Sequence, residues 1–281
     1  MNIVEFNGIK TTSIGFGTSL LTRNNCLKDA LLNLETAYDC GIRHFDVSRL
    51  YGFGQAEEIV GMFSKNKRES ITITTKSGLS TLQIPLFALP FLNKFRKIIK
   101  KSSKITNTAN GLLLNGKFSS TSIQKDLELS LTKLKTDYID FYLLHEANIY
   151  QANYPEILNT LEFEKKKGKI LNFGIASNAL KIVNDFSILN EKYEIIQHNS
   201  NLVNDEIHKI NIDNLKRLRI VYNIFSNENK KYAEYLYLQS GFTNPYEFIL
   251  NLYKNLNSSG ITLFSSLNNN NIKATSKIWF Q

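Results

Sequence analysis

The sequence contains few of the residues that build crosslinked or membrane-spanning proteins. Its 281 residues include only two cysteines, Cys26 and Cys40, together with four prolines and one tryptophan. The longest uncharged apolar stretch, residues 84–92, is interrupted by Pro85 and Pro90 and is far shorter than the ~20 residues that cross a bilayer. We therefore expect neither a disulfide framework, nor a fibre, nor an integral membrane span.

The first residues, MNIVEFNG, lack both the basic start and the apolar core of a signal peptide, so we expect a reducing, cytoplasmic location. The composition, 42% hydrophobic and 21% charged, predicts a globular chain with a large core. Its net charge of +9 favours anionic ligands without choosing among nucleotide, nucleic acid and membrane surface. No recognition motif accompanies that charge, so no nucleic-acid partner is expected, and the sequence indicates no oligomeric state.

Short β-branched or aromatic runs alternate with longer segments of helical spacing, which is typical of a parallel α/β sheet. Eight such runs predict strands, and one barrel of the (β/α)8, or TIM, type is therefore expected as a single domain over residues 1–281. The predicted strands are Ser13–Thr18, Ile42–Asp46, Ile71–Lys76, Tyr138–His145, Ile170–Ser177, Tyr193–Asn199, Leu218–Phe225 and Ile261–Ser266.

Three helices between the strands are especially clear from their spacing, at Leu27–Cys40, Thr121–Lys135 and Pro245–Leu256. Ser122 is the expected cap of the second of these. The Asn-Gly turn at residues 7–8 predicts an N-terminal β-hairpin that covers the bottom of the barrel.

Polar residues follow or end three consecutive predicted strands, where a barrel places its chemistry. Asp46 ends the second strand, with Tyr51 five residues further on, while Lys76 and His145 end the third and fourth strands. Singly, such residues are more often helix caps, solvated charges or backbone-bonded histidines. Because a buried ion needs a partner, their occurrence together favours a common site.

These four side chains suggest a proton donor to a carbonyl group. A lysine ammonium ~4 Å from a tyrosine hydroxyl favours the phenolate by about 4 kcal/mol at an effective dielectric constant of 20, so we expect Lys76 to lower the pKa of Tyr51. Asp46 would keep Lys76 charged, and His145 would hydrogen-bond a carbonyl oxygen that gains negative charge. No metal-binding set is apparent.

The sequence resembles the aldo-keto reductases over nearly its whole length. The resemblance is carried by GFGT at residues 15–18, GIRHFDVSRLYGFGQAEEIVG at 41–61, TTK at 74–76, SLTKLKTDYIDFYLLH at 130–145 and GKILNFGIASN at 168–178. It implies reduction of a small-molecule aldehyde or ketone with NADPH or NADH. It further implies Tyr51 as proton donor, with Asp46, Lys76 and His145 completing the tetrad.

The resemblance also implies residues that bind the cofactor. Ser177, Asn178 and Gln197 match positions that hold the nicotinamide carboxamide, and Tyr222 matches the aromatic residue on which the ring stacks. The further cofactor positions that it implies are Gly17, Thr18, Asp46, Ser265 and Asn271.

The end of the last predicted strand and the segment after it depart from the family pattern. Ser265, Asn271, Ala274 and Thr275 stand where the family has a basic residue and an R-x-x-E-N pattern around the adenosine phosphate. Since an amide cannot replace a bidentate arginine, the preference between NADPH and NADH stays open. The same departure is the basis of a second hypothesis, in which the protein is a catalytically weak nucleotide-binding barrel with a regulatory or interaction role.

Residues 84–104 combine an apolar stretch with basic residues beside the expected mouth of the barrel. They are interpreted as a variable surface loop. The alternative is a lid for a sugar substrate that is phosphorylated or nucleotide-linked, or a segment that contacts an anionic membrane surface.

Overall fold

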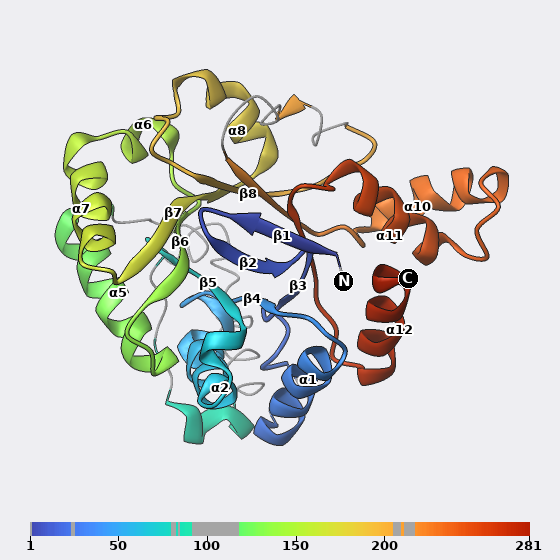
Figure 1. Ribbon diagram of the computed structural model, residues 1–281, viewed down its shortest axis with the longest axis horizontal. Helices are drawn as coiled ribbons and strands as arrows, with labels where there is room; N and C mark the ends of the chain where they lie inside the picture. Colours follow the sequence, from blue (N-terminus) through green and yellow to red (C-terminus); the bar gives the residue numbers. More distant parts are fainter. Residues whose placement is uncertain are drawn as a thin grey trace, which may run out of the picture.

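The computed structural model describes residues 2–23, 26–79, 83, 85–91, 118–204, 209–210 and 217–281. Eight parallel strands form a closed barrel, in the order β10-β3-β4-β5-β6-β7-β8-β9 (Figure 1). They are β3 (Ile14–Gly17), β4 (His44–Asp46), β5 (Thr72–Ser77), β6 (Ile139–His145), β7 (Ile170–Ser177), β8 (Ile195–Asn199), β9 (Leu218–Tyr222) and β10 (Ile261–Phe264). The predicted TIM barrel is confirmed.

Helices surround the barrel, as Figure 1 shows. The α-helices of the described residues are α1 (Leu27–Asp39), α2 (Gln55–Ser64), α5 (Ser120–Leu134), α6 (Ile149–Ala152), α7 (Pro155–Lys166), α8 (Ala179–Asp185), α10 (Asn227–Leu236), α11 (Pro245–Leu256) and α12 (Asn269–Phe280). Cys26 and Cys40, at the two ends of α1, are free thiols.

The cap predicted for α5 is corrected by the structure. Ser119, not Ser122, is the N-cap: its hydroxyl accepts a hydrogen bond from the Ser122 amide at 3.2 Å. Ser122 instead stands at the third helical position, and its hydroxyl accepts from the Ser119 amide at 3.0 Å. The two serines thus form a reciprocal capping box, in which each satisfies one backbone donor.

Side-chain alternation along the strands divides the core into two parts. Phe141 and Leu143 of β6 pack inside the barrel, whereas Tyr142 and Leu144 pack outside it, among the helices. Full burial of each such side chain contributes ~1.5–3 kcal/mol. Since neighbouring parallel strands keep paired residues on the same side, the register determines which polar residues enter the barrel.

The N-terminal hairpin, β1 (Ile3–Phe6) and β2 (Ile9–Thr12), covers the amino ends of the barrel strands, as predicted. Val4 packs into the interior cluster. At the turn, the Asn7 side chain donates to Asn172 Oδ1 at 2.7 Å and to Glu194 Oε1 at 3.0 Å. The hairpin therefore closes the bottom, and the opposite end provides the cavity.

Candidate active site

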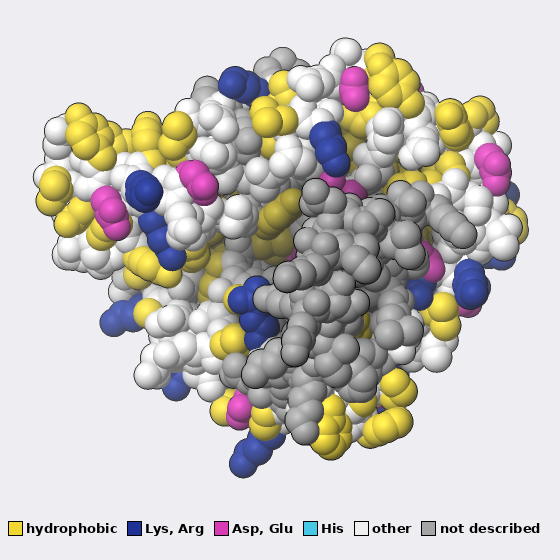
Figure 2. Space-filling model, turned by 180° about the vertical axis from the view of Figure 1, so that it is seen from behind, with side chains coloured by type: hydrophobic (Ala, Val, Ile, Leu, Met, Phe, Trp, Pro, Cys, Tyr) yellow, Lys and Arg dark blue, Asp and Glu magenta, His cyan; other side chains and the backbone are white. Residues whose placement is uncertain are grey.

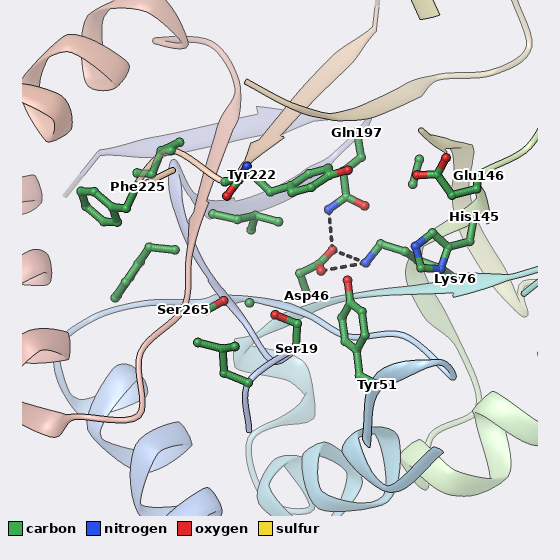
Figure 3. A pocket seen from close by; sticks show the side chains of 17 residues that line it. Ser19, Asp46, Tyr51, Lys76, His145, Glu146, Gln197, Tyr222, Phe225 and Ser265 are labelled. Atoms are coloured by element: carbon green, nitrogen blue, oxygen red, sulfur yellow. Dashed lines mark hydrogen bonds and ion pairs between the residues drawn. The ribbon is translucent and has the colours of Figure 1, made fainter. Parts of the chain in front are cut away.

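The four residues of the predicted tetrad meet at the carboxyl ends of the strands. Asp46 ends β4, Lys76 lies in β5, His145 ends β6, and Tyr51 begins the short helix η1 (Tyr51–Gly54). All four line one cavity of about 400 Å³ (Figure 3). The structure thus brings together the four side chains that the strand ends predicted.

An ion pair forms the floor of this cavity. Lys76 Nζ lies 2.7 Å from Asp46 Oδ1 and 2.8 Å from Oδ2, and it also donates to the Val47 carbonyl at 3.0 Å. Gln197 Nε2 donates to Asp46 Oδ2 at 2.7 Å. Both ions are nearly fully buried. Each therefore supplies the counter-charge that the other requires in a site closed to water.

The pKa of Tyr51 is shifted in the direction opposite to the prediction. Burial raises it well above its usual value near 10, and the Asp46 carboxylate raises it further. Lys76 Nζ does lie 5.2 Å from the centre of the Tyr51 ring. Its charge, however, is already paired with Asp46, so the nearby lysine does not offset the desolvation of a phenolate. Tyr51 is a protonated phenol in this site.

The loop from β4 to α2 has an unusual backbone that directs Tyr51 into the cavity. Gly52, Phe53 and Gly54 all have positive φ angles, of 59°, 56° and 82°. A Cβ atom on Gly52 would collide with Thr22, so only glycine fits there. These turns set the phenol on the side of the cavity that faces Asp46 and Lys76 (Figure 3).

His145 is a neutral imidazole. Burial, together with the Lys76 charge, lowers its pKa to about 3. The Ser48 hydroxyl lies 3.2 Å from His145 Nδ1, and the same oxygen accepts from the Leu50 amide. When the Ser48 hydroxyl donates its proton to Nδ1, the N–H of the neutral ring is on Nε2 and is free to donate into the cavity. The His145 and Tyr51 rings are perpendicular to each other, with centroids 6.4 Å apart.

Besides Asp46, four of the predicted cofactor positions line the cavity: Gly17, Gln197, Tyr222 and Ser265. A Cβ on Gly17 would lie 2.7 Å from Ser265 Oγ, so glycine keeps this wall open. Gln197 is 1% exposed, and its Oε1 atom has no hydrogen-bond partner among the described residues. Figure 3 shows the Tyr222 side chain extending across the cavity beside Gln197.

The other four predicted cofactor residues lie outside this cavity. Thr18 is buried and donates its hydroxyl to the Asp46 carbonyl at 3.0 Å. Asn178 caps α8 by accepting from the Leu180 amide, and Asn271 lies exposed on α12. Ser177 lines a neighbouring cavity, whereas Ala176, one residue earlier on β7, lines the main one.

Other residues that line the cavity were not predicted from the sequence, and Glu146 and Phe225 are two of them. Glu146 directly follows His145, and Phe225 stacks on Tyr246 of α11 with centroids 4.5 Å apart. The sequence holds a signal for Glu146, because this residue directly continues the polar end of the strand that His145 closes. No local pattern singles out Phe225.

Figure 2 views the face opposite to that of Figure 1, and it shows lysine and arginine side chains in several separate places with acidic ones among them. The segment 84–104 falls largely outside the described residues. Within the described ranges, no three His, Cys, Asp or Glu side chains gather as a metal site requires. In the part of the chain that the structure describes, every helix is too short or too polar to span a bilayer.

Comparison with known protein families shows to which family this barrel belongs. The model of the aldo/keto reductase family matches residues 13–243, which is most of the chain. The chain belongs to this family. The resemblance read from the sequence motifs is thereby confirmed.

Individual aldo/keto reductase relatives are distant. The oxidoreductase YqkF of Bacillus subtilis is 30% identical over 176 residues, which make up 62% of this chain and 48% of that protein. The NADH-specific methylglyoxal reductase of Escherichia coli is 27% identical over 201 residues, 67% of this chain and 55% of its own. The match thus spans about half the length of these relatives.

Solved aldo-keto reductases share the fold over nearly the whole chain. The holo form of AKR11C1 from Bacillus halodurans superposes with a TM-score of 0.73 and 18% identity, over 99% of this chain and 90% of that one. An enzyme from Klebsiella pneumoniae in complex with NADPH gives a TM-score of 0.71 and 16% identity, over 100% and 90%. At such identities the likeness establishes the barrel.

Proposed function

We propose that this protein reduces an aldehyde or ketone, such as a sugar, to an alcohol with NADPH or NADH. The observation that carries the proposal is the convergence of Tyr51, His145 and the buried Asp46–Lys76 pair in one cavity. A NADH-specific reductase and a NADPH-bound structure among the similar proteins support it. In this proposal Tyr51 is the acid and His145 a hydrogen-bond donor, while Lys76 is the ion-pair partner of Asp46.

The residues present fit a nicotinamide. Gln197 Oε1, buried without a partner among the described residues, would accept from the carboxamide, and the Tyr222 ring provides an aromatic surface. Ser177 lines the neighbouring cavity and not this one. In our proposal, Gln197 therefore makes the main hydrogen bond to the carboxamide. A bound dihydronicotinamide supplies the hydride.

The protein side chains supply the proton and stabilise the charge. Tyr51 keeps its proton because burial raises its pKa, and it donates that proton to the carbonyl oxygen as negative charge develops there. His145 donates from Nε2 to the same oxygen. Lys76, 5.2 Å from the centre of the Tyr51 ring, stabilises the phenolate that remains.

The test is Tyr51→Phe, which removes the hydroxyl and keeps the ring. We expect kcat to fall by about 10²–10⁴-fold, because general acid catalysis contributes that much, while the Kd of NADPH or NADH stays within about twofold. Single-turnover kinetics and cofactor fluorescence measure the two quantities. Near-normal turnover of several aldehydes by the variant would remove the acid assignment.

The second candidate, a regulatory nucleotide-binding barrel, is favoured by the segment after β10. Ser265 is the residue of that segment that lines the cavity, and Asn271 is exposed on α12. Titration with NADPH and NADH separately distinguishes the candidates. Tight binding without turnover of any carbonyl compound would support the regulatory barrel, and no binding of either nucleotide would refute both candidates.

A further inference from the structure

Glu146 holds a strained position at the wall of the cavity. Its backbone has a φ angle of 55°, in the left-handed region, and its amide donates to the Ala176 carbonyl at 2.6 Å. For a residue with a side chain this conformation costs ~1–2 kcal/mol, and such residues concentrate at functional sites. The side chain lies beside His145 (Figure 3).

Glu146 also carries the unbalanced charge of this cavity. Among the described residues that line it, three are charged: Asp46, Lys76 and Glu146. Asp46 and Lys76 neutralise each other at 2.7 Å. His145 is neutral because its pKa is lowered to about 3. Among the described residues that line the cavity, the charge left unbalanced is therefore that of the Glu146 carboxylate.

The counter-ion of Glu146 lies on the solvent side. Lys181 Nζ contacts Glu146 Oε2 at 3.0 Å, and the lysine side chain is 65% exposed. Lys181 lines only the neighbouring cavity, whereas Glu146 lies between the two cavities and lines both. An exposed lysine is strongly hydrated and screened, so it offsets the carboxylate only in part. The Glu146 side chain is 32% exposed and is more sheltered than its partner.

We infer that Glu146 selects the substrate by charge. The carboxylate repels substrates that carry a carboxylate or phosphate group, and it accepts hydrogen bonds from the hydroxyl groups of neutral substrates. This inference rests on the proposed reductase function and narrows it. The favoured class is a neutral hydroxylated carbonyl compound, such as an unphosphorylated sugar.

The test compares two pairs of aldehydes that differ in charge. They are glyceraldehyde with glyceraldehyde 3-phosphate, and 4-(hydroxymethyl)benzaldehyde with 4-carboxybenzaldehyde. In Glu146→Gln, which keeps the shape and loses the charge, the ratio of kcat/KM for the anionic member to that for the neutral member should rise about tenfold. The ratio cancels any effect that is common to both members.

Lys181→Gln provides a test of opposite sign. Removal of the counter-ion exposes the full charge of Glu146, so the same ratio should fall about threefold. Lys192→Gln is the matched control. Lys192 forms a similarly exposed ion pair with Glu162 at 2.7 Å, away from the main cavity, and its removal should leave the ratio unchanged.

An unchanged ratio in Glu146→Gln, or an equal change for both members of a pair, would overturn the inference. If the unsubstituted protein reduces no aldehyde with either nucleotide, the reductase proposal fails instead. Calorimetry with benzamide and benzoate then still tests Glu146. Benzamide should bind more tightly, and Glu146→Gln should narrow the difference, whereas equal binding of both would refute the charge selection.

Discussion

The phenol of Tyr51 lies under two opposing influences. Lys76 favours the phenolate, but the pairing of Lys76 with Asp46 cancels most of that field, and burial favours the neutral phenol. A proton donor that starts fully protonated is suited to reduction of a carbonyl. In the proposed reaction, Tyr51 would release its proton only when charge develops on the carbonyl oxygen.

The raised pKa of Tyr51 predicts the pH profile of reduction. A group with a raised pKa stays protonated to higher pH, so kcat/KM for a neutral aldehyde should hold a plateau through pH 9. Steady-state kinetics from pH 6 to about 10 check this, with a substrate that does not titrate. A one-proton decline with its midpoint between about pH 7 and 8 would instead show that Lys76 lowers the pKa.

The loop between β4 and α2 is anchored to a helix that follows a different strand. Arg49, next to Ser48, forms an ion pair with Asp126 of α5, and both side chains are mostly buried. The other carboxylate oxygen of Asp126 accepts from the Gly78 amide, just beyond β5, at 3.2 Å. One carboxylate on α5 therefore positions two segments that lead to Tyr51 and Lys76.

Asp126→Asn should loosen this anchor. Breaking a largely buried pair leaves Arg49 without its counter-charge, and we expect a loss of about 2–3 kcal/mol in the free energy of unfolding. We also expect a fall in kcat of at least about tenfold through misplacement of Tyr51. Urea denaturation and kinetics measure the two effects.

Lys169→Gln is the matched control, because Lys169 pairs with Glu128 of the same helix, α5. It removes the exposed pair with Glu128, and the cost should be within ~0.5 kcal/mol. If the two variants were equally stable, the Arg49–Asp126 pair would not be the anchor.

A second polar cluster, around Asn229, holds the loops that follow the strands of Gln197 and Tyr222. Asn229 of α10 is fully buried, accepts from the Leu202 amide at 2.8 Å, and donates to the Ser200 and Ile224 carbonyls at 3.0 and 3.1 Å. One side chain thus joins the segments after β8 and β9, which lead from Gln197 and Tyr222 respectively.

Closure of the barrel brings distant parts of the chain together. β10 pairs with β3, and α12 packs beside α1 (Figure 1). Trp279 of α12 is 1% exposed, donates from Nε1 to Ser13 Oγ at 3.0 Å, and accepts at its carbonyl from the Asn2 side chain at 2.9 Å. This single tryptophan therefore connects the last helix to the start of the barrel.

Trp279→Ala should destabilise the whole barrel and not only α12. We expect a loss of about 3–5 kcal/mol, because the substitution leaves a large cavity and an unpaired Ser13 hydroxyl. Circular dichroism during denaturation measures the change. Lys277→Ala, exposed on the same helix, should change the free energy of unfolding by ~0.5 kcal/mol or less. A loss below ~1 kcal/mol in Trp279→Ala would show that α12 unfolds separately.

The order of strands and helices could be predicted because it depends on local periodicity. All eight strands lie where β-branched and aromatic runs indicate them, with ends that differ by a few residues. The strand predicted to reach Phe225 ends at Tyr222, since Asn223 turns with a φ angle of 64°. A closed parallel barrel puts strand ends at one rim, so the convergence of Asp46, Lys76 and His145 followed from the strand order alone.

The chemistry of the site depends on contacts between segments far apart in the chain, and periodicity carries no information about them. Strand register turns Ala176 inward and Ser177 outward, a difference of one residue that motif matching does not resolve. The balance of burial, Asp46 and Lys76 reverses the expected shift of the Tyr51 pKa. The local sequence thus determines which side chains end the strands and in what order. The orientation of those side chains, the pKa of Tyr51 and the charge that Glu146 presents to the cavity are decided only when the barrel closes and excludes water.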